Sequence, residues 1–272
     1  MWSTARGGVK NPEHGPGIDQ GNRHNTRSRM CAARWYLSLL FVALLVLAPA
    51  ARSTRANGGD ADLALVVGID ISNSVDWIEY RLQRRGLAYA IRHPDVLAAI
   101  ESGNLKTIAV MVVQWSGDKS QIVAIPWTVL NDAASAVRLS TRMANMERLF
   151  GGHATHIAGM ISYGTRQLSQ MPFRARRKVI DISGDGHDNV AKEPDRSRDE
   201  AIAAGVTING LAIENEEKDL RFYYRDFVIG GPGAFVMRTQ RYEDFGDAMK
   251  NKFIREIAPK LLTTKPKRLD AG

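Results

Sequence analysis

The stretch Leu63-Ala-Leu-Val-Val-Gly-Ile69, followed directly by Asp70-Ile71-Ser72-Asn73-Ser74, decides the fold of this 272-residue chain. A continuous apolar run that ends in a polar loop is typical of a strand buried on both faces of a sheet. Such strands belong to parallel sheets that carry helices on both sides. The polar loop would then lie at the carboxyl edge of the sheet, where folds of this kind bind their ligands.

Strands and helices alternate along the rest of the chain. Further apolar runs predict strands at residues 107–115, 121–127, 178–182, 206–212 and 234–237. Amphipathic periodicity predicts helices at residues 79–91, 132–146, 155–168, 195–204 and 242–257. The turn at residues 116–119 permits only a hairpin, so the strands on either side of it should be antiparallel. The sequence therefore predicts an α/β fold, a Rossmann-like three-layer sandwich with a mostly parallel central sheet, one short antiparallel edge strand and helices on both faces.

The amino-terminal part of the chain has the pattern of a secretory signal peptide. Residues 35–51 carry no charge, arginines flank them on both sides, and Ala48-Pro49-Ala50 fits a small-residue cleavage site. We interpret residues 30–50 as the signal peptide, with Met30 as its start, and residues 1–29 as a disordered extension or a mis-called start. Cleavage after Ala50 would leave a periplasmic or secreted protein with no stable membrane span. An uncleaved membrane anchor is the alternative, because a tilted helix or a thinned bilayer accommodates a short apolar run.

Beyond the signal peptide, we expect a linker at residues 51–61, one domain at residues 62–262 and a basic tail at residues 263–272. The formal charge is +8, but residues 1–50 hold six Lys or Arg and two Asp or Glu, which leaves +4 for the remainder. The basic clusters are not interleaved with stacking aromatic residues, so the sequence indicates no nucleic-acid binding. The sole cysteine, Cys31, would leave with the signal peptide. Disulfides, thiolate catalysis and cysteine-ligated metals are thereby excluded for the mature chain.

Three loops rich in side-chain oxygens follow predicted strands or precede a predicted helix. Asp70, Ser72 and Ser74 follow the first strand, Thr155 follows a Gly-Gly loop, and Asp185 follows the strand at 178–182. Alternate side chains of an extended D-x-S-x-S loop point the same way, so one carboxylate and two hydroxyls converge. Few carboxylates, several hydroxyls and room for water suit a magnesium-like cation. The alternative interpretation of residues 70–74 is a helix N-cap, a position that Asp and Ser favour.

With this D-x-S-x-S motif and the distant Thr and Asp, the chain from Asp62 to Ala258 resembles a von Willebrand factor A domain with a metal-ion-dependent adhesion site (MIDAS). Within that superfamily it is similar to a bacterial group of signal-bearing A-like proteins of unknown function. The stretches that carry this second likeness are Ile180-Asp-Ile-Ser-Gly-Asp-Gly186 and Tyr224-Arg-Asp-Phe-Val-Ile-Gly-Gly-Pro-Gly-Ala-Phe235.

The resemblance implies a ligand set for Mg²⁺ or Mn²⁺. Ser72 and Ser74 would bind the ion directly, Asp70 and Asp185 directly or through water, and Thr155 in one of two conformational states. A carboxylate of a protein partner would complete the metal shell. The chain departs from the family pattern in two places: histidines flank the threonine in Gly-Gly-His-Ala-Thr-His, and Ser-Gly-Asp-Gly around Asp185 is one residue longer than the usual T-D-G.

The leading functional prediction is an extracytoplasmic, metal-dependent protein-binding module without enzymatic turnover, which the resemblance suggests is switched by movement of the last helix. The alternative is a metal-dependent hydrolase acting on phosphoryl or acyl groups, with His153, His156 or His187 as acid or base. A structural subunit of an envelope complex is a third possibility. Outside the ligand set, we expect Asp188 and Asn189 to shape their loop, and we interpret Asp181 as a buried partner of other groups.

Overall fold

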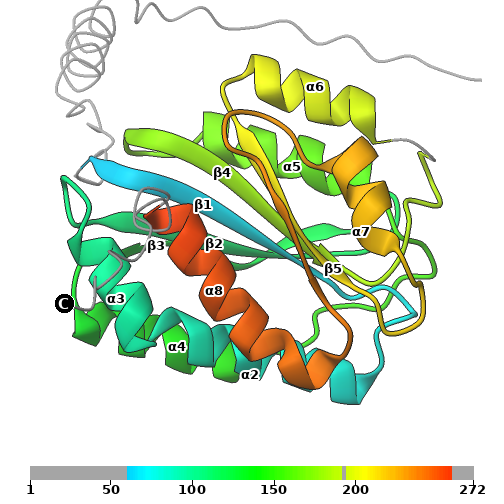
Figure 1. Ribbon diagram of the computed structural model, residues 1–272, viewed down its shortest axis with the longest axis horizontal. Coiled ribbons are helices and arrows are strands. Elements are labelled where there is room, and N and C mark those ends of the chain that lie inside the picture. Colours follow the sequence, from blue (N-terminus) through cyan, green and yellow to red (C-terminus); the bar gives the residue numbers. More distant parts are fainter. Residues whose placement is uncertain (1–59, 192–193, 259–272) are drawn as a thin grey trace, which may run out of the picture. The chain divides into compact units, whose positions relative to one another are not determined.

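The computed structural model describes residues 60–191 and 194–258, so the predicted extension, signal peptide and basic tail lie outside the described residues, as does most of the predicted linker. Within these residues the chain forms a six-stranded sheet in the order β3-β2-β1-β4-β5-β6 (Figure 1). All neighbouring strands are parallel except β2 and β3, which form the predicted antiparallel pair. The strands are β1 (Ala61–Asp70), β2 (Ile108–Trp115), β3 (Gln121–Leu130), β4 (Ala175–Gly184), β5 (Thr207–Ile213) and β6 (Val236–Thr239).

Helices cover both faces of this sheet, which confirms the three-layer α/β sandwich (Figure 1). One face carries α2 (Trp77–Ile91), α3 (Pro94–Glu101), α4 (Ala133–Ala144) and α8 (Phe245–Ile257). The other face carries α5 (Ile157–Ser169), α6 (Asp195–Ala203) and α7 (Leu220–Tyr223), which continues into the π-helical turn η1 (Tyr224–Val228). A 3₁₀ turn, η2 (Tyr242–Asp244), leads into α8. No helix among the described residues is long and apolar enough to cross a membrane.

The central strand β1 owes its unbroken apolar run to burial on both sides. Leu63, Leu65 and Val67 point into the core beneath α2, α4 and α8, whereas Ala64 and Val66 point into the core beneath α5 and α6. All five side chains are fully buried. Because successive residues of a strand face opposite sides, two cores require apolar residues at consecutive positions.

Two helical segments were not predicted from the sequence. The helix at α2 ends before His93-Pro94 as expected, but Pro94 then begins α3. Proline suits the first turn of a helix because its missing N–H has no partner there in any case, and the His93 Nδ1 atom accepts a hydrogen bond from the Asp95 amide at 3.2 Å. The second segment, α7 with η1, spans residues 220–228 and packs against β5.

Candidate metal site

The polar loop after β1 lies beside the loop that follows α4 and the end of β4. Asp70 is the last residue of β1 and Asp185 comes directly after β4. Ser72 forms a parallel bridge with Gly152, which brings the loop after α4 alongside the loop after β1. The Ser74 hydroxyl lies 3.0 Å from the Ser72 hydroxyl and donates to Asp185 Oδ1 at 2.7 Å. Four oxygen-bearing side chains from the loops after β1 and β4 thus lie at one edge of the sheet: Asp70, Ser72, Ser74 and Asp185.

Thr155, the fifth predicted ligand, comes to the same edge from the segment before α5. A Cβ atom placed on Gly186 would lie 4.0 Å from the Thr155 hydroxyl, which places that hydroxyl beside the Asp185 loop. The Thr155 amide donates to Asn189 Oδ1 at 2.9 Å, and the Asn189 amide donates to the Thr155 carbonyl, also at 2.9 Å. These two hydrogen bonds clamp the threonine to the loop after β4.

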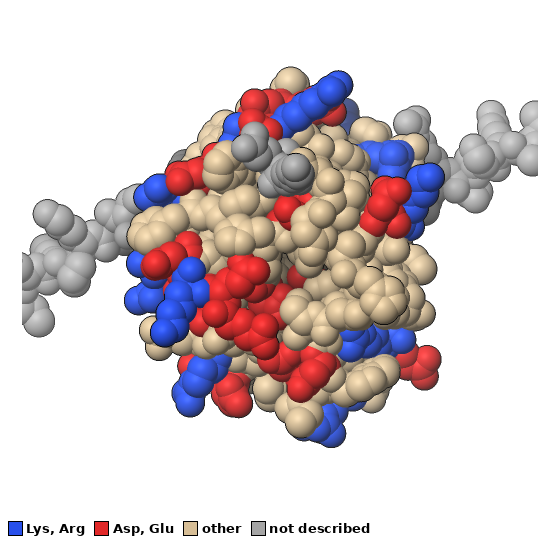
Figure 2. Space-filling view, turned by 90° about the vertical axis from the view of Figure 1, so that its right-hand side faces the viewer, with Lys and Arg blue, Asp and Glu red and all other residues tan. Residues whose placement is uncertain are grey.

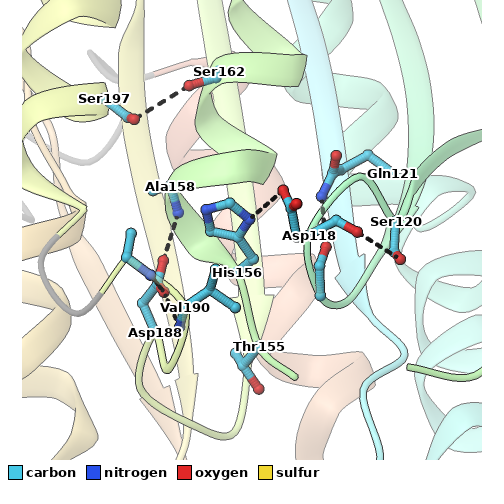
Figure 3. A network of polar contacts seen from close by, with 12 residues as sticks. Asp118, Ser120, Gln121, Thr155, His156, Ala158, Ser162, Asp188, Val190 and Ser197 are labelled. Carbon is cyan, nitrogen blue, oxygen red and sulfur yellow. Dashed lines mark hydrogen bonds and ion pairs between the residues drawn. The ribbon is translucent and has the colours of Figure 1, made fainter. Parts of the chain in front are cut away.

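Asp188 orders the same region by hydrogen bonds to backbone amides (Figure 3). Its Oδ2 atom accepts from the Ala158 amide at 2.8 Å in the first turn of α5, and its Oδ1 atom accepts from the Val190 amide at 2.9 Å. In Figure 3 the Thr155 side chain points away from this network. The loop-shaping role expected for Asp188 and Asn189 is confirmed, and Thr155 keeps its hydroxyl free of both.

Two glycines allow the loops to approach this closely. A Cβ atom on Gly152 would lie 2.0 Å from the Ser116 hydroxyl. A Cβ atom on Gly184 would lie 2.8 Å from the Tyr224 hydroxyl and 3.1 Å from Asp70 Oδ2. Only glycine leaves room at such close approaches, so Gly184 lets β4 end against the Asp70 carboxylate.

The two carboxylates of the site are buried close together. Asp70 is fully buried; its Oδ1 atom accepts from the Ser72 amide at 2.7 Å, and its Oδ2 atom has no hydrogen-bond partner among the described residues. Burial, and then the neighbouring charge of Asp185, raise the pKa of Asp70 to about 7. Burial also raises the pKa of Asp185, although hydrogen bonds from Ser74 and from the Tyr242 hydroxyl, at 2.9 Å, oppose that rise.

The chemistry of this donor set fits a hard divalent cation. Two carboxylates and three hydroxyls are oxygen ligands of the kind that Mg²⁺ prefers. A buried carboxylate oxygen without a partner is costly unless a positive charge compensates it. Sequence reasoning did not identify Tyr242, which lies 57 positions from Asp185 in the chain, and no local motif marks it.

Residues 70–74 do not form the N-cap of α2. That position belongs to Asp76, whose Oδ1 atom accepts from the amides of Ile78 at 2.6 Å and Glu79 at 2.8 Å. The Glu79 carboxylate accepts in return from the Asp76 amide, which completes a capping box. The capping interpretation of the D-x-S-x-S segment is therefore wrong, and its hydroxyls are available to the site.

The three candidate histidines of the hydrolase alternative pair with other side chains. His153 Nδ1 lies 2.7 Å from the side-chain amide nitrogen of Asn73. His156 Nδ1 lies 3.7 Å from the Asp118 carboxylate (Figure 3), and His187 Nδ1 lies 2.5 Å from the Glu217 carboxylate. In the part of the chain that the structure describes, none of them is hydrogen-bonded to a serine or threonine hydroxyl. Within the described ranges, these three histidines are therefore not paired as bases with a hydroxyl nucleophile.

The order of the strands and the position of the site define a von Willebrand factor A-type fold. The chain belongs to the family described as "Protein of unknown function (DUF1194)", which matches residues 60–261. No curated protein matches the chain.

Solved structures with this fold include proximal thread matrix protein 1 from the mussel byssus, with 15% sequence identity and a TM-score of 0.55 over 72% of this chain and 49% of that one. A second structure of the mussel protein has a zinc-occupied MIDAS motif and a TM-score of 0.51, with 16% identity over 72% of this chain and 48% of that one. The von Willebrand factor domain of the type V pili tip protein Mfa5 from Porphyromonas gingivalis has 10% identity and a TM-score of 0.53 over 78% of this chain and 99% of that domain. The chain spans about half the length of the mussel protein, and at these identities the likeness shows the fold.

Proposed function

We propose that the protein is a metal-dependent protein-binding module that acts outside the cytoplasm. The site would hold Mg²⁺ or Mn²⁺, and a carboxylate of a protein partner would complete the shell of the ion. The observation that carries this proposal is the meeting of the five predicted residues at one sheet edge, where Asp70 keeps one buried oxygen without a partner among the described residues. The ligand residues would be Asp70, Ser72, Ser74, Thr155 and Asp185.

The chain's own residues prepare the site for such an ion. Ser74 ties the first loop to Asp185, and Tyr242 holds the other oxygen of the same carboxylate. The ion, when bound, supplies a positive charge with open coordination positions. The hydroxyls bring no charge of their own, so the two carboxylates at most neutralise the bound ion, and a third carboxylate from outside could still coordinate it.

The surface around the site is acidic, so an acidic partner should bind there only when the metal ion is present. Figure 2 shows acidic side chains gathered on the face at the carboxyl ends of the parallel strands. The charge of Glu216 acts on Asp185, and Glu217 lies close to Gly186. Without the cation, this part of the surface would repel a carboxylate, so binding of an acidic partner there should require metal.

Two proteins with the same fold support the proposal, one by its bound metal and one by its place in a pilus. One is a matrix protein with a zinc-occupied MIDAS motif, and another is a domain of a pilus tip protein. We do not propose the hydrolase alternative, because no contact of the candidate histidines, which lie beside Asn73, Asp118 and Glu217, favours it.

Calorimetric titration with Mg²⁺ and Mn²⁺ tests the metal site. Asp70→Ala should abolish binding of both ions, whereas the matched control Asp118→Asn, at an exposed aspartate of a neighbouring loop, should leave it unchanged. Equal binding by Asp70→Ala and wild-type protein would remove the site from consideration. Near-ultraviolet circular dichroism of both variants establishes that they are folded.

Affinity capture from envelope extracts, with and without EDTA, tests the partner. A specific partner should be lost both with EDTA and with Asp70→Ala, and retained with Asp118→Asn. Capture that persists both with EDTA and with Asp70→Ala would contradict metal-bridged recognition. Amino-terminal sequencing of the protein from isolated cell fractions tests its location, and a mature terminus at Ala51 is the expected result.

A further inference from the structure

A pocket opens beside the candidate metal site, between the start of α2 and the segment that follows α4. It has a volume of about 630 Å³, and its walls include three arginines, two aromatic residues and a methionine: Trp77, Tyr80, Arg81, Arg84, Met146 and Arg148. We call it the arginine pocket. Arg148 joins it to the metal loop, because its Nη2 atom donates to the carbonyl oxygens of Ile71 at 2.8 Å and Ser72 at 3.0 Å. A group bound in this pocket would therefore lie next to a group bound at the metal site.

The arginine pocket has more positive charge than the carboxylates in its wall can balance. No acidic side chain within the described ranges forms an ion pair with Arg81, Arg84 or Arg148. Arg84 donates to the carbonyl of Ala144, and Arg148 donates to the two carbonyls of the metal loop while its Nε atom is buried without a partner among these residues. Glu147 is the acid in the pocket wall, so the pocket keeps a net positive charge.

The same pocket presents apolar and aromatic surface. Trp77 is 66% exposed and its neighbour Ile78 is 58% exposed, although both sit on the first turn of α2 beside the metal loop. The Arg148 guanidinium lies 5.4 Å from the ring centre of Trp77 and 5.9 Å from that of Tyr80. Arginine, tryptophan and tyrosine are the residues that most often dominate the energy of protein–protein interfaces.

The charge around the metal site is therefore divided between two sides. Arginines line the pocket between α2 and the segment after α4. Glu79 of α2 accepts a hydrogen bond from Asn215 and lies, with Glu216 and Glu217, on the side of the loop that follows β5. A long, uniformly charged polyanion such as a nucleic acid would gain on one side and lose on the other. A short acidic segment of a polypeptide, with apolar groups next to its carboxylates, matches the side of the arginine pocket alone.

We propose that the arginine pocket is a second recognition site, which binds an acidic side chain of the same polypeptide segment whose other carboxylate binds the metal ion. This inference rests on the proposed function, which supplies the acidic partner, but the pocket should bind an acidic side chain without metal. Arg81 is the residue best placed to contact the segment, because it is exposed and makes no hydrogen bond or ion pair to another described residue. Arg84 and Arg148 hold backbone carbonyls and are positioning residues as well as parts of the pocket.

An acetylated and amidated deca-glutamate peptide is the probe, with deca-glutamine as the neutral control. Binding is measured in EDTA at about 20 mM ionic strength, where charges still act over roughly 20 Å. We expect the glutamate peptide to change the tryptophan fluorescence, and Arg81→Glu to weaken its binding about tenfold. The matched control is Arg166→Glu, the same charge reversal at an exposed arginine of α5, on the opposite face of the sheet. It should change the affinity less than twofold.

Trp77→Phe locates the bound probe. This variant should lose the fluorescence change but keep calorimetric binding, because Trp77 lines the pocket and the other tryptophans of the described ranges, Trp115 and Trp127, do not. Equal losses in Arg81→Glu and Arg166→Glu, no binding in EDTA, or tighter binding of a ten-nucleotide oligothymidylate than of the peptide would each overturn the proposal.

The metal separates this proposal from the proposed function. Arg81→Glu should leave calorimetric binding of Mn²⁺ alone unchanged, whereas Asp70→Ala should abolish Mn²⁺ binding and leave the EDTA-resistant peptide binding intact. If only the Mn²⁺ result fails, the metal site is wrong and the pocket stands. If only the peptide result fails, the arginine pocket is not a recognition site and the metal site stands.

Discussion

Replacing Asp70 by asparagine should stabilise the metal-free protein and remove the effect of magnesium on its stability. The Asp70 carboxylate is fully buried, lies close to Asp185 and keeps one oxygen without a hydrogen-bond partner among the described residues. Asparagine has nearly the same shape, keeps an oxygen to accept from the Ser72 amide and carries no charge. The variant therefore removes the cost of burying a charged carboxylate, and with it the repulsion from Asp185.

The size of the effect follows from the pKa of Asp70. Burial first, and Asp185 second, raise this pKa from 3.8 to about 7. At about 1.4 kcal/mol for each pH unit, this difference corresponds to roughly 4 kcal/mol of cost to the folded state when the group is ionised. The asparagine amide is buried as well and keeps part of that cost. We expect a net gain of about 2 kcal/mol, or about 4–8 °C in Tm for a domain of this size.

The sign of the pH dependence distinguishes this origin from others. The folded protein binds a proton at Asp70 that the unfolded chain releases, so the wild-type protein loses stability as the pH rises from about 4 to about 7. The advantage of Asp70→Asn should be complete above pH 7 and should vanish by pH 5. Thermal unfolding in EDTA at pH 8 and pH 5 measures it.

Magnesium should reverse the ranking of the two proteins. At a concentration of about 100 times the dissociation constant, it should stabilise the wild-type protein by about 2.7 kcal/mol and leave Asp70→Asn unchanged. Asp118→Asn, the exposed control, should behave as wild type throughout. A metal-free Asp70→Asn protein that is less stable than wild type at pH 8, or one that magnesium still stabilises, would refute the reasoning.

Three further variants test the packing around the site. Lys252→Met should destabilise the fold by about 3–5 kcal/mol in urea unfolding, because it leaves buried Asp181 and Glu256 without the ammonium that lies 2.6 and 2.8 Å from them. Asp181→Asn should cost far less, and it should reduce the loss of stability between about pH 4 and 7, since burial and Glu256 raise the pKa of Asp181 to about 7. Tyr242→Phe should cost about 1.5–3 kcal/mol, because it removes a hydrogen bond to the charged Asp185; an unchanged unfolding midpoint would contradict that contact.

The sequence predicted the parts of the site that depend on local pattern and strand order. The D-x-S-x-S spacing is a local signal, and the position of Asp185 follows from the rule that parallel strands end at one edge. Tyr242 and Arg148 escaped prediction because each contacts a backbone or side-chain group more than fifty positions away. The helix α3 escaped because proline ends one helix as readily as it begins the next.

The last helix is tied to β4 at three levels, one of them the pair of hydrogen bonds from Arg177 to the carbonyls of Glu256 and Ile257, and this limits how it can respond to binding. Tyr242 precedes α8 and contacts Asp185 at the end of β4, whereas Lys252 within α8 contacts Asp181 in the middle of the same strand. Moving the whole helix would break the buried ion pair at a cost of about 3–5 kcal/mol. Moving Tyr242 with η2 would break one hydrogen bond, at about 1.5–3 kcal/mol. A switch that the resemblance places in this helix should therefore begin at Tyr242 and leave Lys252 in place unless the partner contributes several kcal/mol more.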